Sequence, residues 1–265
     1  EEEIIKSDWV EGYFKDMWIK YFLRLLYCAY QKAREVIALF DKNMNLQIEL
    51  GCDSRKTRVI HNGVDVNHFS GNIENTKKMD SKITVASILR VVPIKDVKTL
   101  LQAFSMVAKK IKNIEFLIIG PTEENEEYYE ECLQYRDFLE LDNVSFTGRV
   151  DIRDYINSID IHVLSSISEG QPLSVMETLL CKIPNVTTNV GDCNSLIYGE
   201  NDDYGDAGIV VPVMDYERIS EAIIKLCEDE NLREKFGVNG HKRIANNYSY
   251  KSFIDQYAQL YREVG

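Results

Sequence analysis

Long apolar runs are missing from this 265-residue chain, and so is any segment that resembles a secretion signal. A helix that crosses a bilayer needs about 20 consecutive apolar residues, and no stretch of the sequence approaches that length. We therefore expect a cytoplasmic protein without a transmembrane segment. The chain begins Glu-Glu-Glu with no initiator methionine, which indicates a fragment or a processed product.

Positive charge is also in short supply. The chain has 31 basic and 43 acidic residues, which gives a net charge of −12. The field of such a chain repels nucleic acids and anionic membranes, so we expect neither as a partner. If the protein binds phosphate, local arginines, lysines and helix N-termini must overcome that field.

Paired cysteines are absent as well. The six cysteines are scattered, with no C-x-x-C pair and no histidine nearby at zinc spacing. This pattern is typical of reduced thiols in a cytosolic protein. A disulfide framework and a structural metal are therefore not expected.

The N-terminal part of the chain contains short elements without a repeat. Apolar and aromatic residues at spacings of three and four predict an amphipathic helix within residues 8–34. Its apolar face would pack against protein or, as a less common alternative, lie on a membrane surface. The elements expected next are a strand at 35–40, a helix from 43 to 51, a strand at 58–64 and a polar linker at 69–81.

From Lys82 onward, strands and helices alternate. The predicted strands span 83–88, 114–119, 144–146, 159–164, 185–188 and 209–211. The predicted helices span 97–110, 126–140, 152–158, 173–180, 194–198, 216–228, 232–246 and 251–263. Continuous apolar strands alternating with helices predict a doubly wound, Rossmann-like α/β domain with a parallel sheet covered on both faces. With the strand order 3-2-1-4-5-6, a crevice opens between the ends of the first and fourth strands.

The fourth strand leads into the segment SSISEGQPLSVME, residues 165–177. A loop that ends a strand and starts a helix directs backbone N–H groups and the helix dipole into the crevice, where they favour an anion. Glu169 and Glu177 stand eight residues apart and would accept hydrogen bonds from sugar hydroxyls. A simpler interpretation makes Ser174 and Glu177 a capping box and Glu169 a solvated loop residue.

The first strand leads into the loop LRVVPIKD, residues 89–96, which should face that segment across the crevice. Arg90 and Lys95 would clamp a diphosphate, one with a planar fork and the other with a point charge. The alternative is two surface bases beside Asp96, the N-cap of the next helix. The loop lacks the G-x-G-x-x-G motif, which argues against a nicotinamide oxidoreductase.

Together these segments resemble the C-terminal half of a retaining family 4 glycosyltransferase of the GT-B type, most closely the Pel exopolysaccharide-synthesis subfamily. The spacing Glu169-x7-Glu177 matches the Glu-x7-Glu motif of that family. The resemblance extends over residues 20–263. The strings that carry it are RVIHNGVDVNHF at 58–69, RVVPIKD at 90–96, FLIIGPTEE at 116–124, VSFTGRV at 144–150 and SISEGQPLSVMETL at 166–179.

The resemblance implies a role for each matching residue. Arg90 and Lys95 would bind the donor diphosphate and stabilise the charge that develops as the glycosidic bond breaks. Glu169 would hydrogen-bond hydroxyls of the transferred sugar, and Glu177 would take the ribose hydroxyls. The other implied donor-binding residues are Gly148, Arg149 and Val150, which border the base, and Gly170, Gln171, Pro172 and Leu173 near the sugar and phosphate.

The resemblance also implies that the site needs no metal ion, no cofactor and no protein nucleophile. No Asp-x-Asp occurs in the chain, which agrees with a metal-independent mechanism without a cofactor. Retention in this family is usually explained by departure and attack on the same face, so no protein nucleophile is expected. The segment Gly191-Asp192-Cys193 is followed by Asn194-Ser195, where family members often carry a charged pair, and we assign it no donor contact.

Three segments with different roles are implied. Residues 1–65 resemble a remnant of the acceptor domain with the interdomain connection, 66–248 the nucleotide-sugar-binding domain, and 249–265 a crossover helix. We expect transfer of a hexose from a UDP-sugar, by resemblance UDP-glucose, in exopolysaccharide or related glycan synthesis. The alternative is a nucleotide-sugar-binding module without turnover. The glycan acceptor is left unnamed, and peripheral membrane association, association in a complex and self-association through the exposed remnant stay open.

Overall fold

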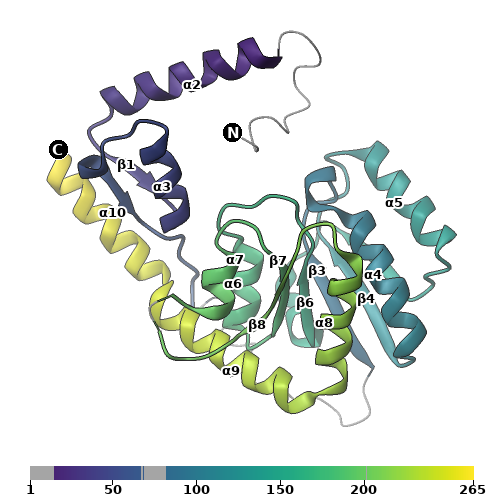
Figure 1. The fold of residues 1–265 in the computed structure, drawn as a ribbon. Coiled ribbons are helices and arrows are strands. Elements are labelled where there is room, and N and C mark those ends of the chain that lie inside the picture. The colour runs from purple at the N-terminus through teal and green to yellow at the C-terminus, as the bar shows by residue number, and fades with distance from the viewer. Residues whose placement is uncertain (1–14, 67, 69–81, 201) are drawn as a thin grey trace. The chain divides into compact units, whose positions relative to one another are not determined.

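The computed structural model describes residues 15–66, 68, 82–200 and 202–265 (Figure 1). The predicted linker at 69–81 and the first residues of the predicted N-terminal helix lie outside these ranges. The chain divides into two compact units. The smaller unit comprises residues 1–62 and 252–265, and the larger one comprises residues 63–251.

A two-stranded parallel sheet lies in the smaller unit, in which Val36 pairs with Thr57. Its elements are α2 (Lys15–Lys32), β1 (Val36–Ala38), α3 (Asp41–Glu49), η2 (Ser54–Lys56), β2 (Thr57–Val59) and most of α10 (Tyr250–Val264). Helix α2 confirms the predicted amphipathic helix from residue 15 onward, and none of its residues is buried. Among the described residues, no helix is both long enough and apolar enough to pass through a bilayer.

A six-stranded parallel sheet forms the centre of the larger unit, in the order β5-β4-β3-β6-β7-β8. The strands are β3 (Ile83–Ile88), β4 (Ile114–Ile119), β5 (Val144–Gly148), β6 (Ile161–Leu164), β7 (Asn185–Thr188) and β8 (Gly208–Val211). In chain order this is 3-2-1-4-5-6, so both the predicted fold class and the predicted strand order are confirmed. The order reverses between β3 and β6.

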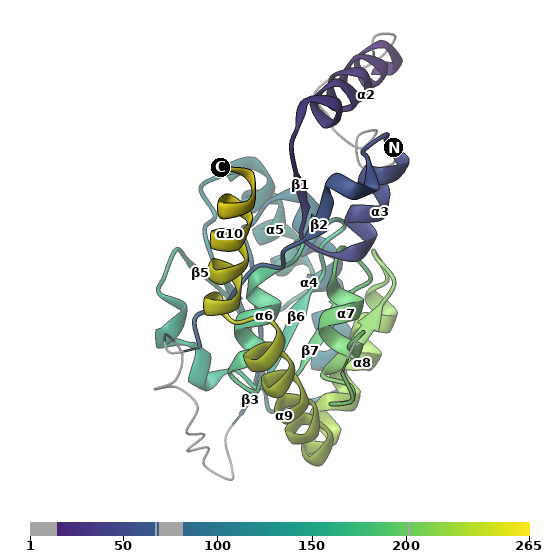
Figure 2. The same cartoon turned by 90° about the vertical axis from the view of Figure 1, so that its left-hand side faces the viewer.

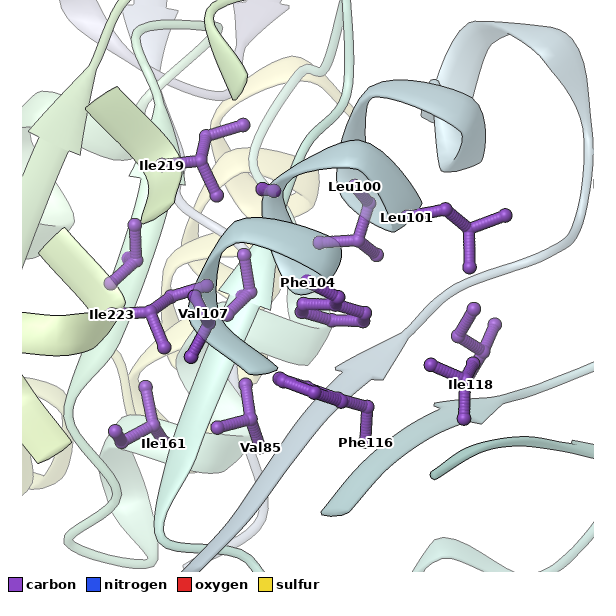
Figure 3. Packing of buried hydrophobic residues seen from close by; sticks show 14 of the residues in the cluster. Val85, Leu100, Leu101, Phe104, Val107, Phe116, Ile118, Ile161, Ile219 and Ile223 are labelled. Atoms are coloured by element: carbon purple, nitrogen blue, oxygen red, sulfur yellow. The ribbon is translucent and has the colours of Figure 1, made fainter. Parts of the chain in front are cut away.

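Helices cover both faces of this sheet (Figures 1 and 2). They are α4 (Val97–Lys110), α5 (Glu126–Phe138), α6 (Leu173–Leu180), α7 (Cys193–Tyr198), α8 (Tyr216–Glu228) and α9 (Glu230–Asn247). Each face has its own apolar core, one under α4 and α8 and the other under α6 and α7. In the first core, Phe104 of α4 stacks on Phe116 of β4 with ring centroids 4.1 Å apart (Figure 3). The strands are mostly apolar because both of their faces are buried, although β7 contains the buried polar residues Asn185, Thr187 and Thr188.

Several predicted element bounds are wrong. The strand expected at 58–64 ends at Val59 as β2, and the helix expected at 126–140 ends at Phe138 as α5. The helix expected at 152–158 consists of two 3-10 turns, η5 (Ile152–Asp154) and η6 (Ile156–Ser158), each closed by hydrogen bonds between residues three apart. The Asp151 side chain accepts from the Arg153 N–H at 3.0 Å, which favours a turn over a longer helix. Strand β6 begins at Ile161 rather than at residue 159, because the Asp160 carboxylate bonds across to the Thr84 N–H.

The histidine inside β6 belongs to the core. His162 is fully buried, and its Nδ1 lies within hydrogen-bond distance of the Asn185 side chain. Burial lowers the pKa of His162 to about 4, although the bond to Asn185 acts in the opposite direction. A neutral, hydrogen-bonded imidazole is stable there, so His162 is a core histidine.

Candidate functional site

A cavity of about 500 Å³ lies at the carboxyl ends of the central strands of the larger unit. Residues that follow β3, β4 and β5 line it, together with residues that lead into α6. Ligands of doubly wound folds bind in this crevice, where the strand order reverses. The cavity therefore stands where the sequence predicts a site.

The loops after β3 and β6 are joined directly to each other. Ser165 Oγ donates a hydrogen bond to the Lys95 carbonyl oxygen at 2.8 Å. The Ile167 N–H donates to the Ile94 carbonyl oxygen at 2.9 Å. The prediction that the two loops face each other across the crevice is confirmed.

Lys95 and Glu169 meet inside this cavity as an ion pair. Their side chains are only 14% and 12% exposed, and Ser166 Oγ donates to the same Glu169 carboxylate oxygen at 2.6 Å. Glu169 is therefore not a solvated loop residue, and Lys95 is not a surface base. A pair with so little exposure is screened weakly, so loss of either partner would leave a strong uncompensated charge in the cavity.

Two arginines line the same cavity and are bound by neighbouring glutamates. Arg90 Nη1 donates to Glu124 at 2.7 Å, and Arg149 Nη2 donates to Glu123 at 2.8 Å. Both arginines are more than half exposed. Exposed ion pairs of this kind contribute less than about 1 kcal/mol, so an anionic ligand could replace the glutamates at small cost.

Gly120 allows the loop after β4 to approach the loop after β3. Its φ is +140°, and an added Cβ would come 2.0 Å from the Leu89 carbonyl oxygen. Any other residue would push the two loops apart. The sequence shows this glycine in the segment GPTEE at 120–124. No role was predicted for Gly120, Pro121 or the two glutamates.

The predicted site residues are only partly brought together. The cavity is lined by Arg90, Lys95, Arg149, Val150, Glu169, Gln171, Pro172 and Leu173. Three further predicted residues, Gly148, Gly170 and Glu177, lie outside its lining. Gly148 instead accepts a hydrogen bond from the Gly120 N–H at 3.2 Å.

Glu177 is the fifth residue of α6, and the start of this helix is not a capping box. Helix α6 has Pro172 at its N-cap and no side-chain hydrogen bond there. The capping interpretation of Ser174 and Glu177 is therefore wrong. Burial raises the pKa of the Glu177 carboxyl. Desolvation therefore destabilises the charged form more than the surrounding residues stabilise it.

Replacing Glu177 with glutamine is expected to raise the melting temperature by about 2 °C at pH 7. The folded pKa of Glu177 is raised, so the charged carboxylate destabilises the unliganded chain at neutral pH. This effect disappears as the pH falls below the ordinary glutamate pKa of about 4.3. Thermal melts of both proteins between pH 4 and pH 8 measure it.

Glu123→Gln is the matched control for this experiment. The pKa of Glu123 is lowered by backbone hydrogen bonds and Arg149, so its replacement should give no gain at pH 7. A Glu177→Gln gain of equal size at pH 4 and pH 8 would contradict the argument from burial.

Comparison with known proteins supports the family assignment. The model of the glycosyl transferases group 1 family matches residues 70–243. The chain belongs to this family. A second model, a domain of unknown function named DUF3492, matches residues 1–55.

Two curated members illustrate the relationship. The chain is 29% identical over 190 residues to the capsular polysaccharide biosynthesis glycosyltransferase CapM of Staphylococcus aureus, covering 70% of this chain and 47% of CapM. It is 27% identical over 274 residues to an N,N'-diacetylbacillosaminyl-diphospho-undecaprenol alpha-1,3-N-acetylgalactosaminyltransferase of Campylobacter jejuni, covering 99% of this chain and 69% of that protein. The chain thus spans about half of one relative and about two thirds of the other.

Solved glycosyltransferase structures share the fold. HepE of Anabaena, solved in complex with UDP and glucose, superposes with a TM-score of 0.76 at 21% identity, covering 91% of this chain and 66% of HepE. A glycosyltransferase of Rickettsia africae superposes with a TM-score of 0.78 at 19% identity, covering 92% of this chain and 67% of that one. These likenesses support the Rossmann-like α/β architecture.

Proposed function

We propose that this chain is the donor-binding half of a retaining glycosyltransferase that transfers a hexose from a UDP-sugar. By resemblance the donor is UDP-glucose, and the product belongs to exopolysaccharide synthesis of the Pel type or a related glycan. The observation that carries this proposal is the presence of Arg90, Lys95 and Arg149 in one cavity of a chain with net charge −12. Each of them pairs with a glutamate, and a diphosphate beside the N-terminus of α6 would replace the exposed Glu124 and Glu123 as the partners of the two arginines.

The solved relative supports the choice of nucleotide. HepE has been solved in complex with UDP-glucose and with UDP. The cavity of about 500 Å³ here has the size that such ligands require. We extend the donor class to this chain on those two grounds.

In this proposal Arg90 and Lys95 bind the diphosphate and stabilise the charge on it as the glycosidic bond breaks. Glu169 hydrogen-bonds the transferred sugar next to the backbone of residues 170–173. Residues 148–150 border the base, and Glu177 takes the ribose hydroxyls. When the donor binds, the phosphate replaces Glu124 as the partner of Arg90. Both partners are charged acceptors, so the arginine keeps a charge-assisted hydrogen bond.

We also propose that donor binding needs no metal ion and that three segments of the chain have different roles. Arginine, lysine and the start of α6 would replace a cation at the diphosphate. Residues 1–65 would be the remnant of the acceptor domain, 66–248 the donor domain and 249–265 the crossover helix. The glycan acceptor is not assigned, and a cytoplasmic location remains part of the proposal.

A second candidate is a nucleotide-sugar-binding module without turnover of its own. The observation that favours it is that the chain spans only 47% of the length of CapM. Acceptor-dependent release of UDP, compared between this chain and a longer form of it, separates the two candidates. Release by the longer form, with or without release by this chain, supports the enzyme, whereas binding without release by either form supports the module.

Calorimetric titration of this chain with UDP and UDP-glucose tests the proposed donor site. We expect both ligands to bind, and we expect the affinities to be unchanged in excess EDTA because no metal is needed. Titration with GDP is the control, and it should bind more weakly if the base contacts discriminate. Binding of neither UDP ligand to the folded chain would contradict a donor site formed by this chain.

A further inference from the structure

A tight turn outside the predicted site packs on the backbone of the loop that bears Glu169. The turn consists of Gly191 and Asp192, between β7 and α7. The Asp192 N–H donates a hydrogen bond to the Gly170 carbonyl oxygen at 2.9 Å. In the other direction, Gln171 Nε2 donates to Asp192 Oδ2 at 2.6 Å. A backbone bond and a charge-assisted bond therefore join the two segments.

Gly191 makes this approach possible. Its φ is +51°, and an added Cβ would lie 2.0 Å from the Gly170 carbonyl oxygen and 2.6 Å from that of Glu169. Both obstructing atoms are backbone, so a side chain at position 191 would displace the loop itself. The contact requires glycine at this position.

The contact between the two segments is buried. Gln171 is 5% exposed and Asp192 is 2% exposed. Loss of the Asp192 carboxylate would leave a desolvated amide donor on Gln171, which is more damaging than loss of an exposed bond. A second bond from the same side, Thr188 Oγ1 to the Ser166 carbonyl oxygen at 2.7 Å, fixes the start of the loop.

The loop is thus held between two neighbours. On one side Lys95 binds the Glu169 carboxylate, and on the other Asp192 binds Gly170 and Gln171. We propose that Gly191 and Asp192 are positioning residues, which fix residues 169–172 so that the Glu169 carboxylate faces the donor sugar. This inference rests on the proposed function, because a role at the sugar requires that a nucleotide sugar binds.

Hydrogen exchange of the loop tests the positioning without any ligand. Asp192→Ala should accelerate amide exchange at residues 169–171 relative to the wild-type chain, and Asp192→Asn should restore most of the protection because its amide oxygen can accept the same bond. Asp215→Ala is the matched control, since Asp215 accepts a bond from the Arg218 N–H at the start of α8, away from this loop. Unchanged exchange at residues 169–171 in Asp192→Ala would overturn the proposal.

Calorimetry with UDP-glucose and UDP then tests the link to the sugar. Asp192→Ala should weaken UDP-glucose binding about tenfold and UDP binding much less, because UDP lacks the sugar that Glu169 would contact. A merely structural role would weaken both ligands alike, and that result would overturn the role at the sugar. If exchange increases as expected but the wild-type chain binds neither ligand, the proposed function fails while the positioning of the loop is supported.

Discussion

Replacing Lys95 with alanine is expected to weaken the binding of UDP and UDP-glucose by about thirtyfold, or roughly 2 kcal/mol. Lys95 lines the cavity, and its side chain is only 14% exposed. A cation held there keeps most of its interaction with a diphosphate, because little water screens it. The substitution also leaves the Glu169 carboxylate without its countercharge, which adds repulsion against the incoming anion. Calorimetric titration of both ligands into each protein measures the loss.

Lys98→Ala is the matched control for this experiment. Lys98 lies three residues further on and bonds Glu131 at 2.6 Å, but both side chains are more than 40% exposed. The two variants change the net charge of the protein equally, so a general loss of positive charge would weaken binding equally in both. We expect the Lys98 variant to bind like the wild-type chain. Equal losses in the two variants, or an unchanged affinity in Lys95→Ala, would contradict a specific role for Lys95.

The fold was predictable because its signals are local and repeated. Most strands from β3 to β8 are short and largely apolar, although β7 is polar, and a helix follows every one of them except β5, which leads into two 3-10 turns. A parallel sheet with helices on both faces buries such runs, and the strand order then determines which loops meet. The meeting of the loops at Lys95 and Glu169 therefore followed from topology alone. The donor-binding roles assigned to these residues stay predictions.

The features of the site that the sequence did not predict depend on strand register and on close backbone contacts. Arg90 and Glu124 are 34 residues apart, and Arg149 and Glu123 are 26 apart. Their pairing follows from how β3, β4 and β5 align, including an irregularity in the β4–β5 register at Ile118 and Ile119. The contact of Gly191 with the Glu169 loop likewise depends on where β7 ends. No periodic pattern in the sequence encodes these distances.

The second large effect is expected at Arg243, in α9. Replacing it with methionine should lower the free energy of unfolding of the larger unit by about 3–5 kcal/mol and its melting temperature by about 10 °C. Arg243 is fully buried. Its Nε and Nη2 donate to the Asp202 carboxylate at 2.9 and 2.8 Å. Its guanidinium also bonds three backbone carbonyls, those of Leu196, Ile197 and Gly205.

Methionine has a similar length but fulfils none of these bonds. It removes the donor of the Leu196 and Gly205 carbonyls, whereas the Ile197 carbonyl keeps a bond from the Ala207 N–H. The Asp202 carboxylate keeps bonds from Tyr204 and Asn247 but loses its countercharge, and this uncompensated buried charge is the most damaging change. Arg218→Met is the control, because Arg218 pairs with Glu221 at the surface and such pairs contribute little. Thermal and urea unfolding of the three proteins measure the difference, and equal melting temperatures would contradict the argument.

Part of the stability that Arg243→Met loses is electrostatic, and the pH dependence of the free energy of unfolding identifies that part. The hydrogen bonds from Arg243 are the main cause that lowers the pKa of Asp202, so the pair contributes stability above the ordinary aspartate pKa of about 3.9. That contribution disappears as the pH falls through the lowered pKa in the folded chain. The difference in the free energy of unfolding between the wild-type chain and Arg243→Met should therefore be largest at pH 7 and smaller in strong acid. Adding Asp202→Asn to the variant should recover part of the loss at pH 7, because it removes the unpaired charge. If the double variant is no more stable than Arg243→Met, the loss comes from the backbone carbonyls and not from the buried carboxylate.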